Sequence, residues 1–217
     1  MPITLNGVEL SDDKLEPAMS SRHTPGTHAQ LKSARVAIAG LGGLGSNIAV
    51  SLARLGVGEL LLVDHDTVEP SNLNRQHYGI SHLGMTKTSA LKSQLADINP
   101  FINIKTVNTT ITADNAVGLF RGYGIVCEAF DNPNTKAMLV STLLSSLPET
   151  KIVAASGIAG FGCSNDIKTS ARLQGRLYVC GDEATGEDAG LMSPRVLICA
   201  GHQANMVLRL ILGAAGA

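Results

Sequence analysis

The sequence predicts an α/β fold: a mostly parallel sheet with helices on both faces, and antiparallel strands added in the C-terminal part. Two observations support this. Between residues 35 and 160, short apolar runs alternate with longer segments of helical periodicity, as in "RVAIAG" followed by "GLGSNIAVSLARLGV". Strands that alternate with such helices form parallel sheets with both faces covered. After residue 160, "FGCSNDIKTSARLQGRLYVCG" alternates in the manner of antiparallel strands.

The individual elements follow from the same runs. We expect strands at residues 35–40, 58–64, 102–111, 123–130 and 150–160. Helices are expected at residues 43–57, 84–100, 113–120 and 132–146, with Pro133 in the first turn of the last of these. Residues 65–79 have turn chemistry and predict a loop, and a Gly- and acid-rich loop at 181–190 precedes a C-terminal helix.

The first 34 residues differ in composition from the rest. They are polar and are interrupted by Pro2, Pro17 and Pro25. We therefore expect residues 1–34 to form an extended arm with one short helix, in which "MPITLNGVEL" is an added strand or a tether. Residues 35–217 are expected to form a single domain.

Composition excludes several classes of function. The formal net charge is -1, which argues against a general electrostatic grip on nucleic acid or on an anionic membrane. The start does not resemble a signal peptide, and polar residues interrupt the apolar C-terminal run, so we expect no membrane span and a cytoplasmic protein. The four cysteines include no CxxC pair, so we expect no zinc.

Four glycines in "GLGGLG", Gly40, Gly42, Gly43 and Gly45, lie between a predicted strand and a predicted helix. Glycines let the backbone approach a phosphate, and the helix N-terminus attracts its negative charge. Asp64 ends the next strand, 64 − 45 = 19 residues later, where an acid binds the ribose of a nucleotide. These features suit a redox dinucleotide and ATP equally well.

The stretch "DHDTVEPSNLNRQ" from Asp64 to Gln76 favours ATP. Arg75 can fork onto phosphate oxygens, and Lys87 follows 87 − 75 = 12 residues later. Two cations beyond a glycine turn suit a triphosphate whose leaving pyrophosphate needs stabilisation. A solvated helix position is the alternative for Lys87. After the fourth strand, Asp131 can hold Mg²⁺, and Asn132 can cap the following helix.

Together these motifs, with "FDN" at 130–132 and "GLMSPRV" at 190–196, resemble the ThiF/MoeB/HesA family, and the match is best to its short, zinc-free ThiF-like branch. The resemblance implies a Rossmann-like fold and ATP-dependent adenylation of a ubiquitin-like sulfur carrier ending in Gly-Gly. It implies a nucleotide-binding part at about 35–157 and a carrier-binding part at about 158–217. The residues that it assigns to ATP are Gly40, Gly42, Gly43, Gly45, Asp64, Asp66, Asn72, Arg75, Gln76, Lys87 and Asn132, with Asp131 for Mg²⁺.

The same resemblance implies a homodimer in which an N-terminal arginine reaches the partner's ATP, and Arg22 is the candidate. Some relatives carry a carrier-linked cysteine before the last helix. Here Cys180 lies at the entrance to that loop, so a covalent role for it stays open. The implied pathway is thiamine biosynthesis. The alternatives are another carrier, such as the molybdopterin one, a tRNA-bound carboxylate of the cyclic threonylcarbamoyladenosine type, and an NAD(P)-dependent oxidoreductase.

Overall fold

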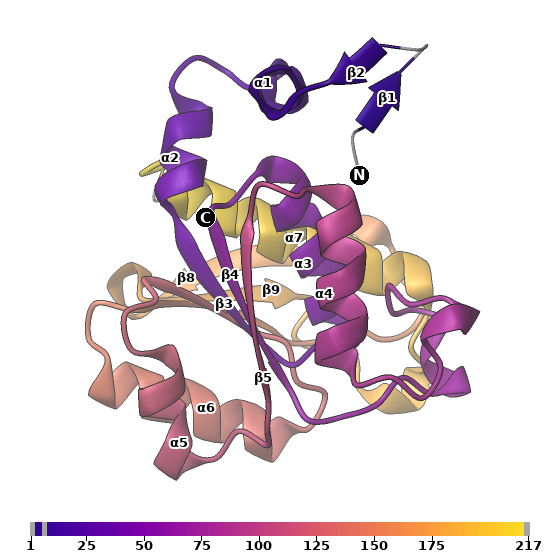
Figure 1. Ribbon diagram of the computed structural model, residues 1–217. Coiled ribbons are helices and arrows are strands. Elements are labelled where there is room, and N and C mark those ends of the chain that lie inside the picture. Colours follow the sequence, from indigo (N-terminus) through magenta and orange to yellow (C-terminus); the bar gives the residue numbers. More distant parts are fainter. Residues whose placement is uncertain (1–2, 6–7, 215–217) are drawn as a thin grey trace.

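A seven-stranded sheet forms the centre of the molecule. The computed structural model describes residues 3–5 and 8–214. The strands of this sheet are β3 (Arg35–Ala39), β4 (Glu59–Asp64), β5 (Asn103–Asn108), β6 (Ile125–Glu128), β7 (Lys151–Ala155), β8 (Lys168–Arg172) and β9 (Leu177–Gly181). Their order is β5-β4-β3-β6-β7-β9-β8 (Figure 1). Every neighbouring pair is parallel except β8 and β9.

Helices cover both faces of this sheet, which confirms the predicted α/β, Rossmann-like class (Figure 1). One face is covered by α3 (Gly43–Leu55), α4 (Lys87–Ile98) and α7 (Ser193–Ile211), and the other by α5 (Ala113–Phe120) and α6 (Pro133–Ser146). The side chains of β3 show why two layers are needed. Val36 and Ile38 belong to the core under α3, whereas Ala37 and Ala39 belong to the core under α5 and α6.

The sheet reverses its direction of growth beside β3. From β3 the chain adds β4 and β5 on one side, and it then crosses to add β6 and β7 on the other side. The connections that leave β3 and β6 therefore diverge and open a crevice at the carboxyl edge of the sheet. Open α/β sheets bind their ligands at such a point.

The C-terminal part continues the parallel sheet further than the sequence predicts. β9 extends the parallel sheet next to β7, and β8 alone runs antiparallel, as the outer strand of the pair. The apolar C-terminal run forms α7, which packs against α3 with one face. Among the described helices, none combines the length and the apolar character needed to cross a membrane.

The N-terminal arm is more structured than expected. β1 (Ile3–Leu5) pairs with β2 (Val8–Leu10), and α1 (Asp12–Ser20) and α2 (Thr27–Ser33) follow. The sequence predicts one short helix in this arm, but the structure has two. The first of them, α1, accommodates Pro17 within it. The arm also belongs to the core, since Leu31 is fully buried and its carbonyl oxygen accepts the Gly58 N–H at 2.9 Å.

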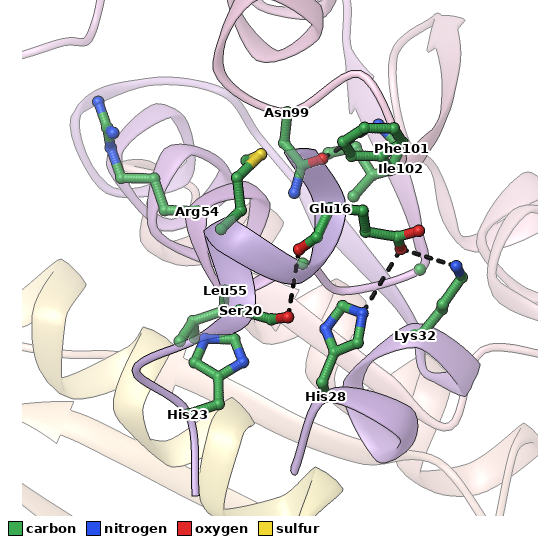
Figure 2. A pocket seen from close by; sticks show the side chains of 13 residues that line it. Glu16, Ser20, His23, His28, Lys32, Arg54, Leu55, Asn99, Phe101 and Ile102 are labelled. Atoms are coloured by element: carbon green, nitrogen blue, oxygen red, sulfur yellow. Dashed lines mark hydrogen bonds and ion pairs between the residues drawn. The ribbon is translucent and has the colours of Figure 1, made fainter. Parts of the chain in front are cut away.

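A small pocket separates this arm from the amino ends of β4 and β5 (Figure 2). Glu16 of α1 spans it, with an oxygen 2.7 Å from Lys32 Nζ and 3.5 Å from His28 Nε2. The volume of the pocket is about 20 Å³, which is room for about one water molecule. This pocket is therefore too small for a nucleotide.

Candidate active site

A cavity of about 1010 Å³ opens at the carboxyl edge of the sheet and extends past the ends of β5, β4, β3, β6, β7 and β9. The structure brings ten of the thirteen predicted site residues to its lining. These are Gly40, Gly42, Gly43, Asp64, Asp66, Arg75, Gln76, Lys87, Asp131 and Asn132. Gly45, Asn72 and Arg22 do not line it. The ligand contacts of all thirteen residues stay predictions.

The glycine turn forms the centre of the cavity wall. Gly40 has a φ of +89°, and a Cβ there would lie 3.0 Å from the carbonyl oxygen of Ala129 on the neighbouring strand connection. A Cβ at Gly42 would meet only Gln76 Nε2, at 3.7 Å, so this glycine keeps the N-terminus of α3 open to the cavity. Gly45 has a packing function that the structure shows directly. Its Cβ would lie 1.8 Å from the Gly40 oxygen, so it allows α3 to pack against the strand.

Asp64 fixes this turn to the end of β4. The residue is 7% exposed, and its two carboxylate oxygens accept the Leu41 N–H at 2.6 Å and the Asp66 N–H at 2.8 Å. Tyr78 supports the turn from below by donating its O–H to the Leu41 oxygen at 2.9 Å, and burial raises the pKa of this phenol. Asp64 thus has a demonstrable structural function, and its predicted contact with ribose would be additional.

The two predicted cations line the same cavity. Lys87 is 6% exposed, and its Nζ lies 2.7 Å from an Asp66 oxygen. The alternative of a solvated helix position for Lys87 is therefore wrong. The Arg75 guanidinium donates to the Ser71 oxygen at 3.1 Å, while its aliphatic stem lies beside Gly43. Both cations are anchored in the lining of the cavity that also contains the N-terminus of α3, a combination that attracts phosphate.

Gln76 and Asn72 belong to one motif but differ in position. The 3₁₀ turn η1 (Pro70–Asn72) uses the Asn72 side chain, whose oxygen accepts the Glu69 N–H at 3.1 Å. Asn72 does not line the cavity, and its contact with ATP stays a prediction. Gln76 is 8% exposed and lines the cavity, and its buried Oε1 has no hydrogen-bond partner among the described residues.

Two places in the cavity offer carboxylate oxygens to a cation: the segment Asp64–Asp66 and Asp131. Asp64, His65 and Asp66 bring donor atoms within 4.8 Å of one another. However, backbone N–H groups occupy both Asp64 oxygens, and Lys87 pairs with Asp66. Asp131 is exposed and lines the cavity, with one oxygen accepting the Asn132 N–H at 2.7 Å. Its remaining carboxylate oxygen suits Mg²⁺ best.

Asn132 caps the N-terminus of α6, as the sequence predicts. Its side-chain oxygen accepts the N–H groups of Asn134 at 2.9 Å and of Thr135 at 3.1 Å. This cap holds the first turn of α6 beside Asp131. The Asn132 side chain thus caps the helix, while Asp131 lines the cavity.

Comparison with known proteins identifies the family. Residues 18–217 match the model of the ThiF family. The chain belongs to the ThiF family. The adenylyltransferase and sulfurtransferase UBA4 of Candida glabrata is 39% identical over 134 residues, which are 61% of this chain and 30% of that protein. The tRNA threonylcarbamoyladenosine dehydratase of Haemophilus influenzae is 37% identical over 121 residues, which are 55% of this chain and 46% of that protein.

Solved structures share the fold of this ThiF-family chain. The E. coli tRNA N6-threonylcarbamoyladenosine dehydratase TcdA, solved in complex with ATP, superposes with a TM-score of 0.82 at 21% identity. That match covers 96% of this chain and 98% of the TcdA chain. E. coli MccB, solved with AMPCPP and MccA, has a TM-score of 0.69 at 22% identity and covers 88% and 59% of the two chains.

One pair of charged residues in the site was not among the predictions. Glu128, at the end of β6, is fully buried; its oxygens accept the Phe130 N–H at 2.7 Å and pair with Lys136 Nζ at 2.6 Å. Burial raises the pKa of Glu128, although Lys136 opposes the shift. Lys136 lines the cavity as a third cation. The signal was present in "EAFDNPNTK", because an acid that ends a buried strand requires a nearby cation.

Two further predicted residues lie outside the cavity. Cys180 is buried in β9, and burial raises the pKa of its thiol to about 11, which is the opposite of what a reactive cysteine needs. Arg22 is exposed in the arm, which contacts the amino ends of the strands, whereas the cavity opens at their carboxyl ends. Within one chain, Arg22 therefore does not approach the site.

Proposed function

We propose that this chain is an ATP-dependent adenylyltransferase that activates the C-terminal glycine carboxylate of a ubiquitin-like sulfur carrier. One observation carries the proposal: a single cavity at the switch point brings the N-terminus of α3, the cations Arg75 and Lys87, and Asp131 together. Membership of the ThiF family favours ATP over a nicotinamide cofactor in this cavity. The chain spans only 30% of the UBA4 relative, so the residues of the site carry this proposal.

The proposed reaction is a displacement at the α-phosphorus of ATP. A carboxylate oxygen of the carrier bonds to that phosphorus, the bond to the bridging oxygen breaks, and pyrophosphate leaves with the electron pair. The protein contributes position and charge. The N–H groups of α3 and the guanidinium of Arg75 face the phosphates, and Lys87 exchanges its Asp66 partner for a phosphate oxygen.

Mg²⁺ is the cation that the phosphates of ATP require, and it would neutralise part of their charge. Asp131 is the residue that we propose to hold it, because one of its oxygens remains without a partner among the described residues. The Asn132 cap fixes the backbone next to this carboxylate.

The end of the cavity over β7 and β9 suits the carrier. Its lining there includes the small residues Ser156, Gly157, Ala159 and Gly186 beside the larger Ile158, Leu191 and Asp188. A narrow backbone such as a Gly-Gly terminus fits such a lining better than a bulky nucleoside does. This observation supports the prediction that residues 158–217 bind the carrier, and we assign the chain to sulfur transfer for thiamine biosynthesis in the cytoplasm.

Activation of a carboxylate on tRNA is the second candidate. The Haemophilus influenzae dehydratase is 37% identical in sequence, and the TcdA structure covers nearly the whole chain. The net charge of -1 disfavours it, because tRNA binding relies on cationic surfaces. A carrier of the molybdopterin type would use the same site as a thiamine carrier.

A homodimer is the second part of the proposal. Arg22 lies in the arm, away from its own cavity, so it can contribute only to the cavity of a second chain. The test mixes two inactive variants, Arg22→Ala and Lys87→Ala. If the arm acts across the dimer, mixed dimers contain one intact site and regain activity. Absence of recovery in dimers shown to exchange subunits would refute this arrangement.

The acceptor is tested by ATP–pyrophosphate exchange. We expect exchange when a carrier ending in Gly-Gly is added, and no exchange when its terminal glycine is removed. Exchange only with threonylcarbamoyl-modified tRNA, weakening steeply with salt, would select the second candidate. NAD binding that ATP does not displace would contradict both.

A further inference from the structure

Two loops form the wall of the cavity over β7 and β9. Residues 156–163 follow β7, and residues 182–191 precede α7. Their backbones bond directly: the Asp182 N–H donates to the Gly157 oxygen at 2.9 Å, and the Gly160 N–H donates to the Gly190 oxygen at 2.7 Å. Both loops contribute lining residues, Gly157 from the first and Thr185 from the second.

Arg195, on the first turn of α7, ties these loops together from behind. Its side chain is buried, with 3% of the residue exposed. One guanidinium nitrogen donates to the Gly162 and Cys163 oxygens, each at 3.0 Å, and another lies 2.5 Å from an Asp182 oxygen. A single side chain thus holds the end of the first loop and the start of the second.

Asp182 extends the connection into the second loop. It accepts the N–H groups of Ala184 and Thr185, each at 2.9 Å. Burial by itself raises the pKa of Asp182, but the N–H donors and Arg195 outweigh it and lower the pKa to about 2. Gly157 has a φ of +72°, and a Cβ there would lie 2.0 Å from an Asp182 oxygen, so only glycine admits the carboxylate. The pair is therefore ionised at neutral pH and enclosed by the fold.

The position of this pair separates it from the predicted nucleotide contacts. Those contacts follow β3, β4 and β6, whereas the wall stands over β7 and β9 at the other end of the cavity. Neither Arg195 nor Asp182 is among the lining residues that the structure describes. Any effect of the pair on a substrate must therefore act through the loops.

We propose that Arg195 and Asp182 are positioning residues that hold the acceptor end of the cavity in shape while leaving the ATP end independent. The inference rests on the proposed function, because it requires an acceptor that enters beside ATP. Breaking the pair frees both loops and loosens the wall. It should therefore weaken the acceptor's binding more than the binding of ATP or the rate at saturation.

The variants break the pair from both sides. Asp182→Asn removes the charge but keeps an oxygen for the Thr185 N–H. Arg195→Met removes the guanidinium, although the adjacent Val196 lies against Gly43, which makes Asp182→Asn the cleaner variant. The double variant tests whether the two act as a unit. The matched control is Arg172→Met, which breaks the exposed Arg172–Glu183 pair beside the same loop.

The kinetic readout is ATP–pyrophosphate exchange with the sulfur carrier ThiS as probe. We expect the KM for ThiS to rise at least tenfold in both single variants, with the KM for ATP and kcat within twofold. The double variant should raise the KM for ThiS no more than the single variant with the larger increase does. Arg172→Met should have the same KM for ThiS as the unmodified chain. Equal increases in both KM values, or no change in either, would overturn the proposal.

A second readout needs no acceptor, so it separates this inference from the proposed function. Hydrogen–deuterium exchange of residues 156–163 and 182–191 should be at least tenfold faster in Asp182→Asn, while calorimetric ATP affinity stays within twofold. Unchanged exchange in both loops, or a parallel loss of ATP affinity, overturns the positioning role. If the unmodified chain activates no acceptor, the proposed function fails, but these two measurements still decide whether the pair holds the wall.

Discussion

Replacing Asp64 with asparagine isolates the contribution of one carboxylate to the glycine turn. In the folded chain its oxygens accept the Leu41 N–H at 2.6 Å and the Asp66 N–H at 2.8 Å in a buried setting. Asparagine keeps one acceptor and turns an NH₂ group toward the other N–H. Two hydrogen bonds to a charged acceptor, each about 1.5–3 kcal/mol, then become one neutral bond of about 1 kcal/mol and one unsatisfied N–H. We expect a total loss of about 3–4 kcal/mol.

Urea unfolding followed by circular dichroism measures this loss, and a thermal melt should show a decrease in Tm of roughly 6–16 °C for a chain of this size. The control is Asp97→Asn on the exposed face of α4, which should stay within about 0.5 kcal/mol of the unmodified chain. A loss below about 1 kcal/mol for Asp64→Asn would refute the reasoning, because the carboxylate would then not hold the turn.

Three further outcomes follow from the site and the sheet. Lys87→Met should weaken ATP binding about 10- to 100-fold by calorimetry, since a charged hydrogen bond is lost; unchanged affinity would contradict a phosphate contact. Lys136→Met should cost about 3 kcal/mol in urea unfolding because it strands the buried Glu128, and adding Glu128→Gln should recover most of this; an additive double variant would contradict the pairing. Burial opposes ionisation of Glu59, but Lys105 and its other partners lower its pKa from 4.5 to about 2. Its stabilisation, roughly 2–3 kcal/mol, is present above pH 4.5 and is lost toward pH 2, so Glu59→Gln should flatten acid unfolding measured over this range.

The central sheet could be predicted because its signals are local. Each parallel strand is a short apolar run, and each helix that follows has its own periodicity and its own cap, such as Asn132 before α6. The arm was harder because Pro17 signals a break, whereas α1 continues through Pro17 and α2 buries Leu31 against the domain. Tertiary contacts of this kind leave no local pattern. For the same reason, the sequence did not reveal that β9 pairs in parallel with β7.

The candidate site was predictable where a residue follows a strand and less so within loops. Asp64 ends β4 and Asp131 follows β6, and both reach the cavity, as their positions imply. In the loop after β4, Gln76 lines the cavity, whereas the Asn72 side chain accepts a backbone N–H of the η1 turn. Arg195 directly follows the second loop but lies 33 residues from Gly162 of the first loop, so only the folded structure shows that it holds both.

The most direct test of the account is the intact mass of the carrier after incubation with this chain, ATP and Mg²⁺. We predict a ThiS species heavier by one adenylyl group. It should form only when the C-terminal glycine is present, and it should be absent with Lys87→Met. A carrier that keeps its original mass, together with threonylcarbamoyl-modified tRNA that is converted under the same conditions, would contradict the assignment to a sulfur carrier.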